Sequence, residues 1–204
     1  GDVAGFSSQL RVLAVDLSKI ASDLRLLASG PRTGLDEIRL PAVQPGSSIM
    51  PGKVNPSIPE MVNQVCFQVI GNDACVSAAA EHGQLELNVM MPVIAHNVLL
   101  SMMIMQNSAR VLAEKTIKGI EANEAMCNYW LERSAALATA LAPQIGYARA
   151  AEISKQSVSE NVLIRDLVKR EKVLSDQEID EALDLRKMTE IGVPGGKHGG
   201  VSAG

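Results

Sequence analysis

The chain has 204 residues, of which 47% are hydrophobic, 2% are aromatic and 21% are charged, and its formal net charge is −4. This length is enough for a real core in one or two domains, and the scarcity of rings beside so many aliphatic residues favours packed helices over a β-sandwich or barrel. The negative charge, without any basic stripe, argues against a nucleic-acid partner, and no apolar run is long enough for a membrane-spanning helix.

Three cysteines, Cys66, Cys75 and Cys127, are odd in number and share no metal-ligand spacing. We interpret them as small buried hydrophobes in a reducing compartment, and therefore expect no metal site and a cytoplasmic location. The sequence shows no signal peptide. Because its first residue is not methionine and helical sequence begins almost at once, we expect it to be the C-terminal part of a longer protein. An artificial expression product is the alternative.

The first long helix is predicted over residues 9–29. Gly30 and Pro31 end it, and prolines and glycines then punctuate residues 31–56. An irregular segment of this length inside a helical protein is typically functional or disordered, and its specific composition favours function. The helix itself has apolar side chains at alternating steps of three and four, the heptad pattern of a helix that packs along a partner: Leu10, Leu13, Leu17, Ile20, Leu24 and Leu27.

Two further long helices are predicted, over residues 58–82 and from Pro92 to Lys118. Ser57 and Glu60 match a capping box at the start of the first of them. Long helices with apolar faces on more than one side indicate a bundle that continues into other chains. The expected fold class is therefore all-α, with a long central helical bundle. The last of these helices carries an apolar stripe over Ile94, Val98, Met102, Met105, Ala109 and Leu112.

Shorter helices are predicted in the last third of the chain. We divide the chain into a bundle domain, residues 1–119, and a small C-terminal helical domain, residues 120–204, whose glycine-rich tail from about residue 192 is expected to be disordered. Ser175 and Glu178 form a second capping box, and its flanks fit a hydrophobic staple. The short helices are expected at 124–140, 147–158, 161–170 and 176–184.

The segment from Gly46 to Asn55, GSSIMPGKVN, concentrates polar groups that suit one small anion. Serine becomes a base only where N–H donors and a cation stabilise its oxyanion. The glycines let the backbone approach a ligand, the helix N-terminus after the loop adds a positive dipole end, and Lys53 with Asn55 can hold a carboxylate. This set suits proton abstraction beside a carboxylate, followed by loss of a β-leaving group. Alternatively, the serines are turn residues, the lysine is a solvated charge and the asparagine is a cap.

The same segment resembles the signature loop of the aspartase/fumarase superfamily, Gly-Ser-Ser-x-Met-Pro-x-Lys-x-Asn, at every fixed position. Residues 23–32, which approach the loop, and residues 83–89, Gly-Gln-Leu-Glu-Leu-Asn-Val, also resemble that family, so the likeness covers nearly the whole chain. It implies an α-helical homotetramer with a central bundle shared by four chains and active sites built from three subunits. It also implies reversible elimination that yields fumarate, with no organic cofactor.

The resemblance further implies residue roles. The first serine of the family's loop is the proton-abstracting base, which gives that role to Ser47. Glu60 would pair with a histidine from another segment, a role that competes with its place in the capping box. Lys53 and Asn55 would bind the substrate carboxylate, and Ser48 would also contact the substrate. Ile49 and Met50 would donate backbone N–H groups as the loop closes.

The flanks of the loop favour the aspartase branch of the family. Residues 57–67, SIPEMVNQVCF, are similar to aspartases, whereas fumarases typically begin this helix with Thr-Gln-Cys-Glu. Met91 stands where aspartases usually carry glutamate, and His96-Asn97 is more similar to fumarases. The expected small-molecule substrate is therefore L-aspartate (or fumarate in reverse), with malate in a class II fumarase as the alternative. A structural protein on the same scaffold, as in lens crystallins, is a third interpretation, against which the intact loop argues.

Overall fold

The computed structural model describes residues 1–44, 46 and 54–190, and it divides into two compact units, Gly1–Glu124 and Ala125–Gly204. Apart from two strands of two residues each, the regular secondary structure of the described residues is helical, which confirms the all-α prediction. The tail predicted to be disordered from about residue 192 lies outside the described residues. Within the described part, no helix combines the length and hydropathy needed to cross a membrane.

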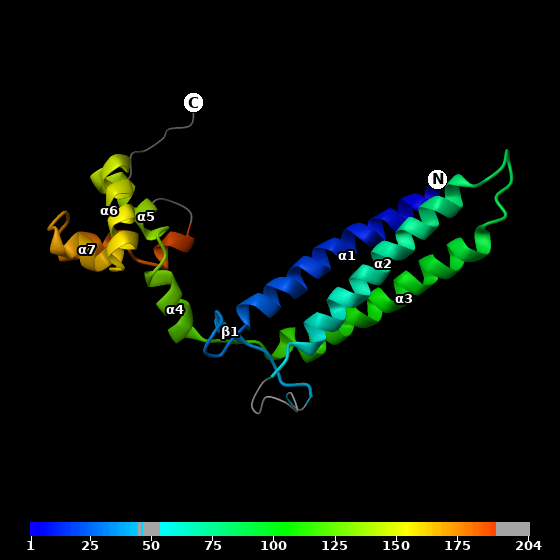
Figure 1. Cartoon of the computed structure of the whole chain (residues 1–204), viewed down its shortest axis with the longest axis horizontal. Helices are drawn as coiled ribbons and strands as arrows, with labels where there is room; N and C mark the ends of the chain where they lie inside the picture. The colour runs from blue at the N-terminus through cyan, green and yellow to red at the C-terminus, as the bar shows by residue number, and fades with distance from the viewer. Residues whose placement is uncertain (45, 47–53, 191–204) are drawn as a thin grey trace. The chain divides into compact units, whose positions relative to one another are not determined.

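The first unit is built on three long helices that lie side by side: α1 (Asp2–Leu27), α2 (Ser57–Glu81) and α3 (Met91–Lys115) (Figure 1). The apolar pattern of the first helix was traced over residues 9–29, and the helix itself begins at Asp2, as a sequence that is helical almost from its first residue predicts. The predicted end of the third at Lys118 was wrong, since a 3-10 turn, η1 (Ile117–Gly119), follows Lys115. The three helices were otherwise predicted in type and order.

The heptad pattern of α1 divides between two faces. Leu10, Leu17 and Leu24 pack against a buried cluster of the bundle, whereas Leu13 is 52% and Ile20 is 49% exposed. The buried cluster consists of residues from all three helices: Ala14, Ala21, Val62, Cys66, Val69, Met105 and Leu112. One half of the predicted seam therefore forms the core of this unit, and the other half presents an apolar surface.

Buried polar side chains also join the helices, which the apolar patterns did not predict. On α3 the buried face includes Ser101, whereas Met102 of the predicted stripe is 44% exposed. Asn72 of α2 donates through Nδ2 to Ser101 Oγ at 3.0 Å, and Ser7 of α1 donates to Asp73 Oδ1 at 2.6 Å. Small hydroxyl-bearing residues allow close helix approach and satisfy the buried amide and carboxylate, which would otherwise be costly.

Two short strands pair within the first unit, β1 (Ile38–Arg39) and β2 (Glu121–Ala122). They are antiparallel, with Ile38 opposite Ala122 and Arg39 opposite Glu121. The backbone N–H of Asn123 extends the contact by donating to the Glu37 carbonyl at 2.9 Å. The long connection was predicted as irregular throughout, so β1 is a correction. A two-residue strand leaves no periodic signal in a sequence.

The second unit consists of short helices around a core of its own. The predicted helix 124–140 was wrong, because α4 (Glu124–Glu132) ends and α5 (Leu137–Ile145) begins separately. The core is formed largely by aliphatic side chains: Leu137, Leu141, Ile153, Ile164, Leu167, Val168, Ile179 and Leu183. The remaining elements are α6 (Tyr147–Glu160), α7 (Ile164–Arg170), α8 (Asp176–Ala182) and η2 (Lys187–Thr189).

The capping box predicted at the start of α8 is confirmed. Ser175 Oγ accepts from the Glu178 backbone N–H at 3.3 Å, and Glu178 Oε2 accepts from the Ser175 backbone N–H at 2.8 Å. Leu174 and Ile179 belong to the same apolar cluster, as a hydrophobic staple requires. Hydrogen bonding from the Ser175 side chain and backbone lowers the pKa of Glu178.

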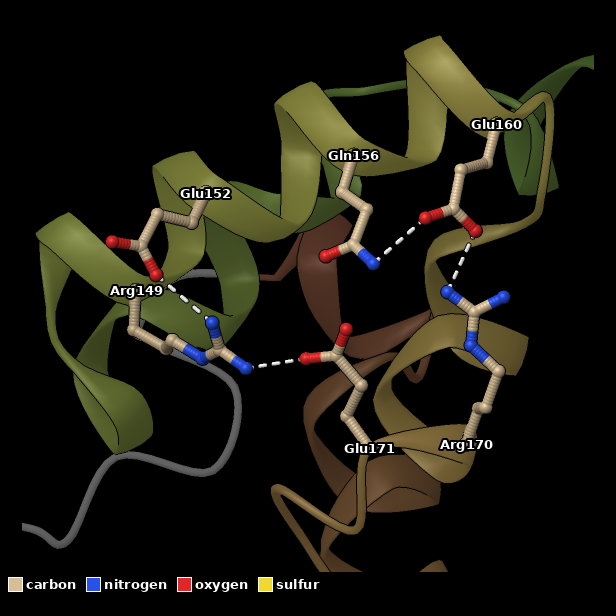
Figure 2. Close-up of polar contacts among 6 residues, drawn as sticks. All are labelled: Arg149, Glu152, Gln156, Glu160, Arg170 and Glu171. Carbon is tan, nitrogen blue, oxygen red and sulfur yellow. Dashed lines mark hydrogen bonds and ion pairs between the residues drawn. The ribbon is translucent and has the colours of Figure 1, made fainter.

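Ion pairs connect α6 to α7, as Figure 2 shows. Arg149 bonds both Glu152 of its own helix, at 2.9 Å, and Glu171 just after α7. At the other end of α6, Glu160 accepts from Arg170 Nη2 at 2.7 Å and from Gln156 at 2.8 Å. The bond from Arg170 is the largest cause that lowers the pKa of Glu160.

Candidate active site

The residues on either side of the signature loop are held by contacts within the first unit. The side-chain amide of Gln44 donates to Ser57 Oγ and so joins the two flanks of the loop. Further upstream, Pro41 lies against Gly119, where an added Cβ would come within 2.6 Å of the proline Cγ. Only glycine fits at position 119 without a shift of this proline. Together with the β1–β2 pair, these contacts fix the approach to the loop.

Asn55, at the end of the loop, lines a cavity of about 280 Å³. The cavity is also lined by Asp36 and by both residues of β1, Ile38 and Arg39. Asp36 accepts from Asn123 Nδ2 at 2.8 Å, so its position is fixed by the segment that follows β2. Residues that carry an amide, a guanidinium and a carboxylate therefore line one small cavity beside the signature loop. Such a combination can hold a small polar ligand with charges of both signs.

Glu60 lies in the first turn of α2 and is half-buried. The predicted capping box with Ser57 is wrong, because the helix starts at Ser57 itself, Pro56 is the N-cap and no side chain caps the helix. Ser57 Oγ instead accepts from Gln44. The Glu60 carboxylate makes no hydrogen bond or ion pair with the described residues. Of the two roles considered for Glu60, the capping role is thus removed.

The other predicted site residues lie outside the described residues: Ser47, Ser48, Ile49, Met50 and Lys53. Among the described ones, no group of three or more His, Cys, Asp and Glu side chains is arranged to hold a metal ion. The interpretation of the cysteines as buried is confirmed for Cys66, and burial raises the pKa of its thiol. Cys75 and Cys127 are only partly buried, and neither is in a disulfide.

Comparison with known proteins gives the same family as the signature loop. Residues 1–71 match the family described as Lyase, and residues 137–190 match the family described as Fumarase C C-terminus. The chain is 50% identical to aspartate ammonia-lyase of Bacillus subtilis (strain 168) over 189 residues, which cover 93% of this chain and 40% of that protein. The chain belongs to the aspartase/fumarase superfamily.

Other relatives in this superfamily carry different names. Fumarate hydratase class II of Corynebacterium glutamicum is 50% identical over 189 residues, covering 90% of this chain and 40% of that protein. The crystal structure of fumarate lyase:delta crystallin from Brucella melitensis has a TM-score of 0.86 and 55% identity, covering 93% of this chain and 41% of that chain. This chain thus spans about two fifths of the length of the relatives it matches.

Some features of the site were not foreseen from the sequence. Arg39 and Asp36 share a cavity with Asn55 because the β1–β2 pair and the Asn123 side chain place them there. The sequence carries no signal for this arrangement, since the pairing joins segments more than eighty residues apart. Asn63, one turn after Glu60, is buried in a polar cluster that an apolar pattern does not reveal.

Proposed function

We propose that this chain is part of an aspartate ammonia-lyase, which reversibly converts L-aspartate to fumarate and ammonia. The observation that carries the proposal is the complete signature loop, Gly46 to Asn55, in a chain about half identical to several aspartate ammonia-lyases. The aspartase-like sequence of residues 57–67 favours this branch. The cavity beside Asn55, bordered by groups of both charges, suits an amino-dicarboxylate.

The proposed mechanism begins with Ser47. Its oxyanion takes a proton from C3 of aspartate, and the electron pair left on C3 moves into the neighbouring carboxylate to give an aci-carboxylate. This dianionic group is stabilised by Lys53, the Asn55 amide and the loop N–H groups of Ile49 and Met50, with Ser48 completing the binding set. The pair then returns to form the C2–C3 double bond as the C2–N bond breaks and its electrons leave with nitrogen, so the substrate's ammonium group departs as ammonia.

Glu60 fits a supporting role in this scheme. Because it caps no helix and has no partner among the described residues, its carboxylate is available to a histidine from another segment. Such a pair would hold the histidine in one tautomer and orientation. No organic cofactor enters the scheme, because the loop itself supplies the cation and the N–H donors.

Substrate and base are tested on the full-length enzyme. We expect fumarate to form from L-aspartate, and Ser47→Ala to lower kcat by several orders of magnitude while the circular-dichroism spectrum and assembly stay unchanged. Fumarate formation from L-malate but not from L-aspartate would overturn the choice of substrate. Near-normal turnover by Ser47→Ala would remove this residue from the role of base.

A class II fumarase is the second candidate, and a specific observation favours it. His96-Asn97 is more similar to fumarases, and a relative that is 50% identical is named fumarate hydratase class II, whereas Met91 departs from both branches. Met91 is the first residue of α3 and is 51% exposed, so its side chain is free to contact another segment. The two-substrate assay above decides between the candidates.

The proposal also includes a homotetramer in the cytosol. The exposed apolar side chains of α1 and α3 support assembly with further chains, and the absence of disulfides among three cysteines fits a reducing compartment.

A purely structural protein on this scaffold would not need to bind substrate. We therefore expect fumarate or L-aspartate at about 100 times its Kd to stabilise the assembly by roughly 2.7 kcal/mol. A melting temperature that does not change with either ligand would favour the structural protein.

A further inference from the structure

The first turn of α2 carries Glu60, yet no side chain caps it. An uncapped helix end has free backbone N–H groups and frays readily unless packing holds it. The first polar anchor beyond Glu60 is Asn63, which is 3% exposed. Residues three apart are neighbours on a helix surface, so Asn63 lies beside Glu60 on α2. Whatever holds Asn63 therefore also holds the backbone of the turn that carries Glu60.

Asn63 uses both ends of its amide against α1. Its Nδ2 lies 2.9 Å from the Ser18 carbonyl, 2.9 Å from Ser18 Oγ and 3.1 Å from Ser22 Oγ. Its Oδ1 accepts from Arg25 Nη1 at 3.0 Å. Hydrogen bonds are directional, so this buried and fully satisfied amide allows less rotation between the two helices than apolar contact alone.

We propose that Asn63 is a positioning residue: its hydrogen bonds to α1 fix the first turn of α2 and thereby hold Glu60 in place for its proposed histidine partner. This inference rests on the proposed function, because the position of Glu60 matters only if that carboxylate acts in the site. The effect on catalysis is large, since a displacement of about 1 Å can cost on the order of a hundredfold in rate.

The same helix offers a matched control, Asn72. It is 4% exposed, donates to Ser101 Oγ of α3 and accepts from Gln68 at 2.8 Å. It lies nine residues after Asn63, which is about 14 Å further along the helix axis. Residue type, burial and number of partner helices are alike, whereas Asn72 lies further from Glu60 and makes fewer hydrogen bonds.

The test compares Asn63→Leu with Asn72→Leu in the full-length enzyme, with Ser47→Ala in parallel. We expect both leucine variants to lose thermal stability, Asn63→Leu more because it removes more hydrogen bonds. Only Asn63→Leu should lower kcat, by about tenfold or more with KM changed less than about threefold. Equal kcat values for the two leucine variants would overturn the inference. If that happens while Ser47→Ala is inactive, the proposed function stands and the positioning role alone fails.

A second pair decides the question if Asn63→Leu does not fold. Arg25 and Arg11 are exposed residues of α1 that each bond a buried polar residue of α2, Asn63 and Asp73 respectively. We expect Arg25→Met to lower kcat several-fold and Arg11→Met to leave it unchanged, although the latter unpairs the buried Asp73 carboxylate and costs more stability. An Arg25→Met enzyme with wild-type kcat would then overturn the inference.

Discussion

Asn55 is the last residue of the signature loop, shortly before α2, and it lines the cavity of about 280 Å³. In the proposed function its amide donates to a substrate carboxylate. A hydrogen bond to a charged group contributes about 1.5–3 kcal/mol, so we expect Asn55→Ala to lower kcat/KM for L-aspartate by roughly ten- to a hundredfold. Steady-state kinetics on the full-length enzyme measure this. Asn107→Ala, at an exposed position on α3 whose amide oxygen accepts from Arg110, is the control and should change nothing.

Asn55→Ala should weaken substrate binding as well as slow the chemical step, because the carboxylate is present in both the substrate and the aci-carboxylate intermediate. A kcat/KM within twofold of wild type for Asn55→Ala would contradict a binding role. Arg39 borders the same cavity and has no ion pair among the described residues.

The roles of Ser47, Lys53 and Asn55 stay predictions, and they rest on chemistry that is specific in itself. Serines, a lysine and an asparagine in fixed order indicate carboxylate binding before any fold is known. Arg39 and Asn63 were not predictable, since their places depend on the β1–β2 pair and on the close approach of α1 and α2. At Ser57 the sequence pattern predicted a helix cap that does not form. Its hydroxyl oxygen instead accepts a hydrogen bond from the Gln44 side chain. Tertiary contacts overrode a local signal there.

At the scale of elements, helices were predictable in type because their apolar periodicity is long and regular. The ends of the helices and the breaks between them were less predictable. The break between α4 and α5 follows from no glycine or proline, and the last turn of α3 tightens into η1 where Gly119 must accommodate Pro41. The α8 cap was predictable because both of its hydrogen bonds are local to residues 175–178. Local interactions can be read from a sequence, whereas inter-element contacts need the fold.

The pairing of α6 with α7 through Glu160 and Arg170 predicts a pH effect. The bond from Arg170 lowers the pKa of Glu160 below its ordinary value of 4.5, so the stabilisation is present above pH 4.5 and is lost as pH falls through the lowered pKa. We expect Glu160→Gln to weaken hydrogen-exchange protection in α6 and α7 near neutral pH. The difference from wild type should vanish in acid, where both side chains are neutral.

Exchange rates are compared between variant and wild type at each pH, so intrinsic exchange cancels. Glu181→Gln is the control, because Glu181 accepts only from Gln177 at 3.1 Å and forms no ion pair within the described part of the chain. A difference for Glu160→Gln that persists unchanged below the lowered pKa would show that the ion pair is not its cause. Since Glu160 is at the surface, salt should also reduce the effect.

At the scale of the whole molecule, the apolar surface of α1 must be covered if the enzyme is to be soluble and active. Leu13 and Ile20 are about half exposed on a helix whose other apolar face, at Leu17, is already used by the core. Isolated exposed apolar residues are ordinary, but a row of them at heptad spacing on a long helix indicates a helical partner. In the proposed homotetramer that partner is another chain.

We therefore expect Leu13→Asp combined with Ile20→Asp to dissociate the full-length enzyme, because unpaired charges would be buried at each interface. Light scattering coupled to size exclusion should show a mass below that of the tetramer. Activity on L-aspartate should be lost in parallel, since each proposed site draws on three subunits. Gln9→Asp adds one such charge at an exposed polar position of α1 and should leave both mass and activity unchanged. A double variant that stays tetrameric and active would show that the exposed apolar side chains of Leu13 and Ile20 are not needed for assembly.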